Sequence, residues 1–256
     1  MSEASGRRAA PRARSVALLG AGLAAVAALA FVADRKADAP VPAERAAKPT
    51  LMLLTTLPLM FSEKFGIEDG GLPALSALAM QYTVTSIGVA DHAALGRGKL
   101  LLMAHPLAQP AEALVDLDHW VRRGGRVLLL ADPMLEWPSQ RPLGDPLRPP
   151  PAFADTGLLG HWGLRLDAPD QRGPRQLALG ARTILTASPG ALAALPGASV
   201  SQTCAISSDR LVAHCRIGKG TATIVADADF LDVEDLDGRA DNNLKALVEE
   251  LAALER

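Results

Sequence analysis

Six polar side chains follow or end short apolar runs of the sequence, where many α/β proteins carry their functional groups. They are Thr55, Thr56, His105, Asp132, Asp227 and Asp229. If the apolar runs are parallel strands, these side chains share the carboxyl edge of a sheet, where open α/β sheets bind ligands. The dipeptides His105-Pro106 and Asp132-Pro133 also suit a chain that bends out of a sheet while its side chains bond to backbone amides. We favour this structural interpretation and keep the six residues as weak ligand-binding candidates.

The sequence lacks the arrangement that acyl transfer requires. That chemistry needs a Cys or Ser between glycines on a sharp strand-to-helix turn, together with a His and a carboxylate. No Gly-x-Cys-x-Gly or Gly-x-Ser-x-Gly occurs, and His214 next to Cys215 on a strand would point to the opposite face. We therefore expect no enzymatic activity and assign no catalytic residue.

The two cysteines have a structural explanation. If Cys204 and Cys215 face each other across a hairpin, its centre lies in the polar pair Asp209-Arg210, which suits a turn, and Ile206 faces Ala213. In an exported domain such a pair oxidises to a disulfide. Two free, buried cysteines acting as small hydrophobic residues are the alternative.

Seven carboxylates between residues 227 and 241 form an acidic run. They are Asp227, Asp229, Asp232, Glu234, Asp235, Asp237 and Asp241. Calcium or magnesium accepts such oxygens, but no glycine stands at the sixth position of an EF-hand loop. A solvated loop that leads into the start of a helix explains the run, so we predict no metal and no other cofactor.

Composition restricts the class of protein. The chain has 256 residues, of which 49% are hydrophobic and 21% charged, which is typical of a globular protein with a sizeable core. Its formal net charge is -2, and its nine aromatic residues do not cluster. We therefore expect no nucleic-acid partner.

The first 48 residues differ in charge from the rest. They hold eight Lys or Arg and four Asp or Glu, which leaves 18 and 24 for residues 49 to 256, a net charge of -6. Ser15 to Ala33 carry no charge and would form a helix about 28 Å long, close to the thickness of a bilayer core. Arginines before this run favour a cytoplasmic tail over residues 1–14, a membrane span over 15–33 and a periplasmic domain in a bacterial-type inner membrane.

A cleavable signal peptide remains the alternative to the span, because small residues at Ala28-Leu29-Ala30 and Ala37-Asp38-Ala39 suit a signal peptidase. Either interpretation exports the remainder of the chain. Residues 34–49 contain charges, alanines and three prolines without an apolar face, as expected for a linker.

Residues 50–256 alternate between buried apolar runs and helical patterns. The runs at 50–57, 99–104 and 126–131 predict strands covered on both faces, and 83–89 predicts another. Helices are expected at 72–80, 110–123, 153–162 and 241–254, and further strands at 175–179, 182–187, 200–206, 211–217 and 221–227. The pattern predicts an α/β fold with a mostly parallel sheet and helices on both faces.

A proline-rich loop is expected over residues 133–151, where seven prolines exclude regular structure. Trp137 in this loop is either packed onto the domain or a contact residue for a partner, as interface tryptophans often are.

Five segments of the sequence resemble a known protein family. KLLLMAHP, WVRRGG, RVLLLADP, GKGTATIVADADFL and DNNLKALVEEL are similar to the glutamine-amidotransferase-like domain of gliding-motility-type ABC-transporter accessory proteins and related uncharacterised membrane-anchored proteins. The resemblance covers about residues 50 to 254. It implies a flavodoxin-like domain without amidotransferase activity, outside the cytoplasmic membrane beside a transporter.

Together these features favour a non-enzymatic, membrane-anchored accessory domain that contacts transporter or other membrane proteins. A ligand-sensing or solute-binding module that uses the strand ends is the alternative, and a hydrolase whose catalytic residues the sequence does not identify ranks third.

Overall fold

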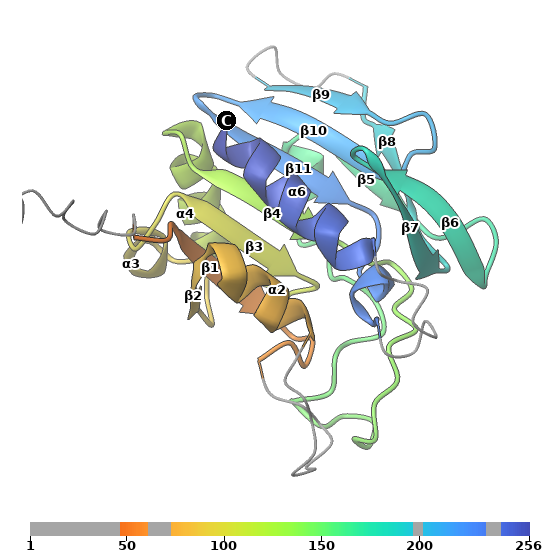
Figure 1. Cartoon of the computed structure of the whole chain (residues 1–256). Coiled ribbons are helices and arrows are strands. Elements are labelled where there is room, and N and C mark those ends of the chain that lie inside the picture. Colours follow the sequence, from red (N-terminus) through yellow and green to blue (C-terminus); the bar gives the residue numbers. More distant parts are fainter. Residues whose placement is uncertain (1–46, 61–72, 197–201, 234–241) are drawn as a thin grey trace, which may run out of the picture. The chain divides into compact units, whose positions relative to one another are not determined.

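The computed structural model describes residues 47–60, 73–196, 202–233 and 242–256 (Figure 1). From Lys48 to Arg256 they belong to one compact unit. The predicted tail 1–14, the span 15–33 and nearly all of the linker 34–49 lie outside the described residues. Within the described ranges, no helix is both long and apolar enough to cross a bilayer.

A seven-stranded sheet forms the centre of the domain, with the order β2-β1-β3-β4-β11-β10-β9. The strands are β1 (Thr50–Thr55), β2 (Thr83–Ser86), β3 (Leu100–Ala104), β4 (Arg126–Leu130), β9 (Gln202–Ile206), β10 (Val212–Ile217) and β11 (Gly220–Val225). The first five in this order are parallel, and β10 and β9 extend the sheet antiparallel. The predicted α/β fold with a mostly parallel sheet is confirmed.

Strand β3 is apolar at every position because both faces of the sheet are covered. In β3, Leu100 and Leu102 belong to one hydrophobic cluster, while Leu101 and Met103 belong to the other. Successive residues of a strand point to opposite faces, so an unbroken apolar run supplies both clusters.

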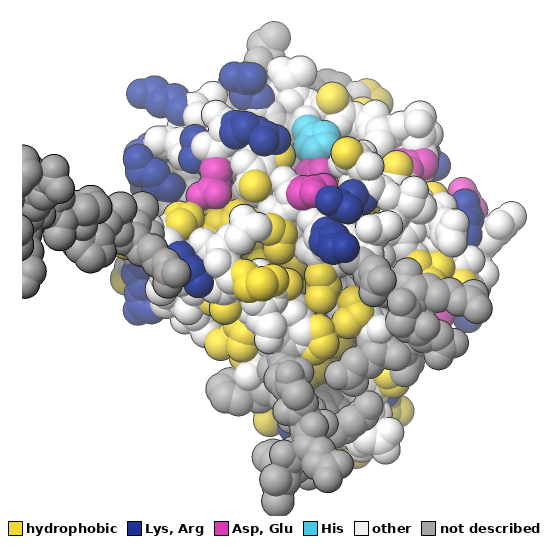
Figure 2. Space-filling view, viewed as in Figure 1, with side chains coloured by type: hydrophobic (Ala, Val, Ile, Leu, Met, Phe, Trp, Pro, Cys, Tyr) yellow, Lys and Arg dark blue, Asp and Glu magenta, His cyan; other side chains and the backbone are white. Residues whose placement is uncertain are grey.

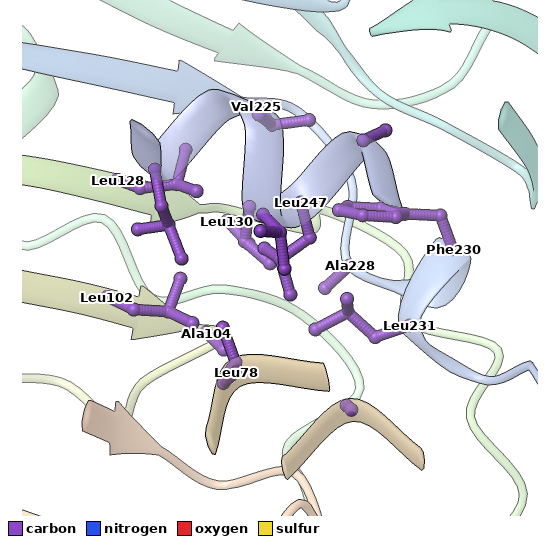
Figure 3. Close-up of a cluster of buried hydrophobic side chains, with 14 of the residues drawn as sticks. Leu78, Leu102, Ala104, Leu128, Leu130, Val225, Ala228, Phe230, Leu231 and Leu247 are labelled. Carbon is purple, nitrogen blue, oxygen red and sulfur yellow. The ribbon is translucent and has the colours of Figure 1, made fainter. Parts of the chain in front are cut away.

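Helices cover each face of the sheet, as predicted. α2 (Pro73–Gln81) and α6 (Asn243–Glu255) share a cluster with one face, and α3 (His92–Leu95), α4 (Ala111–Arg122) and α5 (Leu158–His161) share the other. Figure 3 shows Leu78 and Leu247 on the helix side of the first cluster, facing Leu102 and Leu128 of the sheet.

Between β4 and β9 in the sequence, the chain forms two small antiparallel sheets that are separate from the main one. They pair β5 (Leu164–Asp167) with β8 (Ala191–Ala194), and β6 (Pro174–Leu179) with β7 (Arg182–Ala187). β6 and β7 match the predicted strands, whereas β5 and β8 were not predicted. The helix expected over 153–162 is reduced to α5, because Gly157 before it has a left-handed φ of 101° that a helix cannot continue through.

The predicted hairpin between the cysteines is present in the predicted register. Cys204 lies opposite Cys215, Ile206 lies opposite Ala213, and a disulfide joins the two sulfurs. The disulfide therefore connects the edge strand β9 to β10.

Candidate functional site

The six strand-end residues all lie at the carboxyl edge of the parallel strands. They follow the sheet order, with the threonines at the end of β1, His105 after β3, Asp132 after β4, and Asp227 and Asp229 after β11. His105, Asp132 and Asp227 are fully buried. The sequence predicted this shared edge but not the burial.

Thr55 and Thr56 connect the ends of two neighbouring strands. The Thr55 Oγ1 donates to the carbonyl oxygen of Ala104 at 2.8 Å, and the Thr56 Oγ1 donates to the carbonyl oxygen of His105 at 2.5 Å. The Thr55 Oγ1 also accepts from the amide of Leu57 at 3.0 Å. Both hydroxyls are therefore occupied by backbone groups.

His105 adopts a left-handed conformation, with φ 47°, directly after β3. This is the kind of sharp turn that exposes the nucleophile in many α/β enzymes. Here the side chain is buried, its Nε2 lies 2.8 Å from the carbonyl oxygen of Pro150, and its Nδ1 has no partner. Burial lowers the pKa of His105, so the ring is neutral near pH 7, and the contact to Pro150 implies that Nε2 carries the hydrogen.

The carboxylate of Asp132 accepts hydrogen bonds from two backbone segments, one that follows β4 and one that follows β11. Its Oδ1 accepts from the amide of Met134 at 2.8 Å, and its Oδ2 accepts from the amide of Ala228 at 2.9 Å. The first bond starts the proline-rich loop, and the second joins that loop to the segment after β11. These are the backbone bonds expected of an Asp that precedes a proline turn.

Asp227 and Asp229 flank the start of the short 3-10 helix η1 (Asp229–Leu231). The Asp227 Oδ1 accepts from Thr186 Oγ1 at 2.6 Å and from the amide of Phe230 at 3.1 Å, while its Oδ2 is buried without a partner. Both carboxylate oxygens of Asp229 accept from the amide of Glu136, at 3.1 and 2.9 Å.

Burial and mutual repulsion favour the protonated forms of these carboxyl groups. Burial raises the pKa of Asp132 to about 6, and the charge of Glu136 adds to the shift. Burial and the charge of Asp132 raise the pKa of Asp229 to about 8 and place the pKa of Asp227 well above its usual range. The cluster therefore holds protons near neutral pH.

Three further residues belong to this cluster and were not predicted. Glu136 accepts a hydrogen bond from Ser188 Oγ at 2.5 Å, and Ser188 is fully buried with a left-handed φ of 43°. Thr186 donates to Asp227. Thr186 is the second-last residue of β7, and Ser188 directly follows that strand. β7 pairs with β6 in a separate two-stranded sheet, so the sequence carries no signal that its end contacts the carboxylates.

The acidic run is only partly described. Within residues 47–60, 73–196, 202–233 and 242–256, no group of three His, Cys, Asp or Glu side chains is arranged to hold a metal ion. Glu234, Asp235, Asp237 and Asp241 lie outside these ranges.

Two hollows on the described surface are not lined by the buried carboxylates Asp132, Asp227 and Asp229. One of about 300 Å³ is bordered by Trp137, Leu143, Arg148 and Pro150 of the proline-rich loop. Another of about 560 Å³ is bordered by residues of α2 and α6, among them Met80, and Figure 2 shows the apolar surface in this part of the molecule. None of the six strand-end residues borders either hollow.

Comparisons with known proteins give structural similarity only. No protein-family model and no curated protein matches the sequence. A ThuA-like protein from Bacteroides uniformis ATCC 8492 is similar at TM-score 0.43 and 9% identity, over 82% of this chain and 92% of that one. A cytoplasmic protein from Salmonella typhimurium LT2 is similar at TM-score 0.44 and 12% identity, over 80% and 99%.

Glycosidases are also structurally similar. The exo-beta-1,4-mannosidase Op5Man5 from Opitutaceae bacterium strain TAV5 has TM-score 0.47 and 14% identity, over 78% of this chain and 35% of that one. The chain thus spans about a third of the length of this enzyme. The similarities describe an arrangement of sheet and helices, and no activity is transferred from them.

Proposed function

We propose that this chain is a non-enzymatic, membrane-anchored extracytoplasmic accessory protein that acts by contact with other proteins of an ABC-type transport or envelope assembly. One observation carries the proposal: the carboxyl edge of the sheet, where an α/β enzyme or binding protein would hold its ligand, is covered by the chain itself. The resemblance to accessory domains supports the same class of function.

The covering is made by hydrogen bonds from the proline-rich loop and from Phe153, which closely follows it. Pro150 accepts from His105, the amide of Glu136 donates to Asp229, and the amide of Phe153 donates to the carbonyl oxygen of Asp132 at 2.6 Å. A general acid or base must lie within reach of its substrate. His105 and Asp132, with no exposed surface, do not meet that requirement in this conformation.

The outer side of the same loop carries apolar side chains suited to a protein partner. Leu143 is 88% exposed and Leu147 is 66% exposed, and Leu143 borders the same hollow as Trp137. Trp137 is half-buried and packs against the hydrophobic core from this side. An apolar anchor beside a shallow hollow is typical of the energetic centre of an interface.

Crosslinking in intact membranes, followed by identification of the captured proteins, tests this proposal. We expect L143S/L147S and W137A to reduce capture of a specific partner by about tenfold. The control is M80S, because Met80 is 73% exposed on α2, away from the loop. Equal capture by all variants, or glutaminase or esterase turnover by the pure protein that a single Ser, Cys or His substitution removes, would contradict the proposal.

A ligand-sensing module remains a second candidate, because two buried polar atoms at this edge have no partner. They are His105 Nδ1 and Asp227 Oδ2. A solute that binds there after the loop opens would stabilise the protein against heat. Stabilisation by a defined solute that D227N removes would favour this candidate.

A further inference from the structure

The amino edge of the sheet, opposite the buried carboxylates, carries a group of exposed or half-exposed cations. We call this group the basic edge; it consists of Arg97, Lys99, Arg123, Arg126, Arg216, Lys219 and Arg256. Figure 2 shows Lys and Arg side chains gathered on the side from which β3 and β4 start in Figure 1.

Strand register and backbone bonds bring these residues together from distant parts of the sequence. Lys99 immediately precedes β3, and its carbonyl oxygen accepts from the amide of Arg126 at the start of β4. Arg126 pairs with Thr221, and Thr221 pairs with Arg216 on the other side. The amide of Lys219 donates to the carbonyl oxygen of Arg122 at 3.0 Å, which places it beside Arg123.

The basic edge differs from several arginines elsewhere in the described domain, which are paired with carboxylates. Elsewhere Arg165 and Arg210 bind Asp167, and Arg182 binds Glu249. Within the described ranges, no carboxylate pairs with a residue of the basic edge. The neighbouring Asp118 is occupied by Arg122 and Trp162, and Glu255 accepts from Tyr82. Among the described residues, a domain with an excess of carboxylates therefore leaves the cations of this edge without a paired side-chain carboxylate.

The chain also enters the domain at this edge. Lys48 precedes β1, Thr50 pairs with Thr83 at the start of β2, and the space beside Gly98 is bordered by Thr50. The 16 residues 34–49 reach at most about 55 Å when fully extended. The segment that carries the predicted span therefore joins the domain at the basic edge and not at the carboxyl edge.

We propose that the basic edge docks on the headgroups of anionic phospholipids in the membrane that holds the anchor. This inference rests on the anchored topology of the proposed function. Anionic surfaces attract Lys and Arg within about a Debye length, and tethering gives a high effective concentration of lipid next to this edge. An acidic protein partner would have no such permanent proximity, which is why we assign the surface to lipid.

Lysine modification in vesicles tests the docking directly. The full chain is reconstituted into vesicles of phosphatidylcholine alone or of an equimolar mixture with phosphatidylglycerol, and a soluble acylating reagent is added. We expect Lys99 and Lys219 to react more slowly in the anionic vesicles, relative to the exposed Lys245 on α6 as an internal reference. The slowing should be lost in about 1 M salt, where the Debye length falls to about 3 Å.

Charge variants make the test specific. R123E/R216E should abolish the slowing at Lys99 and Lys219, whereas R172E/R175E, which reverses two exposed cations at β6, should retain it. Equal loss in both variants would overturn the assignment to this edge.

An alkaline carbonate wash separates the two proposals. Equal reactivity in both kinds of vesicle, with the chain retained after the wash, overturns docking and leaves the anchor intact. Slowing in a chain that the wash releases supports binding of the basic edge to anionic lipid but rejects the anchor, and with it the tethered form of docking.

Discussion

The two edges of the parallel sheet handle charge in opposite ways. At the carboxyl edge, Asp132, Asp227 and Asp229 are buried or nearly so, and backbone amides and hydroxyls bind their oxygens. At the amino edge, the cations of the basic edge are exposed or half-exposed, and no side-chain carboxylate of the described part of the chain pairs with them. The buried carboxylates stabilise contacts within the domain. The exposed cations are available to bind an anionic partner outside it.

We infer that the buried residues of the carboxyl edge stabilise the fold, whereas the exposed residues of the amino edge are available for binding. Removing a buried acceptor leaves its donors unsatisfied, which is costly, but removing a solvated charge costs little. Stability measurements on variants of each edge therefore test the comparison.

The largest effect is expected from the disulfide, which holds the edge strand β9 to β10, the strand that carries Arg216. In the chain-entropy model, a loop of this length contributes on the order of 3 kcal/mol, so C204A/C215A should lower the melting temperature by about 6–12 °C in calorimetry. Intact mass after alkylation should show no free thiol until a reductant is added. Two alkylated thiols in protein exported and purified without reductant would show that the disulfide does not form.

At the carboxyl edge, D132A should decrease the free energy of unfolding by about 2 kcal/mol, because the amides of Met134 and Ala228 lose their acceptor. Denaturant titration measures the change. The matched control is D170A, since Asp170 is exposed. If D132A unfolds like the control while partner capture is lost, the carboxyl edge is a binding site and the structural interpretation is wrong.

The raised pKa values at this edge predict a dependence of stability on pH. The folded protein holds a proton on Asp229 up to about pH 8 and on Asp132 up to about pH 6, whereas the ordinary value is 3.8. Because the folded state binds more protons, the free energy of unfolding should fall as pH rises from about 4 to about 8.

D229N should reduce the dependence of the free energy of unfolding on pH between about pH 6 and pH 8. The amide oxygen of Asn still accepts from the amide of Glu136, but the side chain no longer titrates. Melting temperatures at a series of pH values measure it, with D170N as the control. An identical slope in both variants would assign the titration to other groups.

The smallest effect is expected at the amino edge. R123E/R216E should change the free energy of unfolding by less than about 0.5 kcal/mol, because both side chains are exposed. A loss comparable to that of D132A would mean that both edges contribute to the stability of the fold.

Much of the fold followed from the sequence because its signals are local. The continuous apolar runs predicted the parallel strands, and the polar turn between the cysteines predicted the register of the β9–β10 hairpin. β5 and β8 were missed because Leu164–Asp167 and Ala191–Ala194 are short and pair with each other across 23 intervening residues. Such pairing leaves no local pattern.

The candidate site was predicted less completely. Strand ends identified Asp132 and Asp227, but burial under a loop depends on tertiary contacts such as that between Pro150 and His105. The same holds for Ser188, whose contact with Glu136 joins residues 52 positions apart. The basic edge was equally hidden, since its cations are scattered from residue 97 to residue 256 and only the sheet register assembles them.

The pairing of β4 with β11 has a consequence for how the protein folds. Arg126 pairs with Thr221, 95 residues later in the chain. During synthesis or export, β2, β1, β3 and β4 can pair first, which leaves β4, with its sequence RVLLL, as an open apolar edge until β11 arrives. Long-range pairing of this kind slows folding and exposes unpaired strand edges to other chains. Aggregation of newly made protein should therefore depend on the interval before β11 emerges, and a chain truncated before Gly220 should be the most aggregation-prone form.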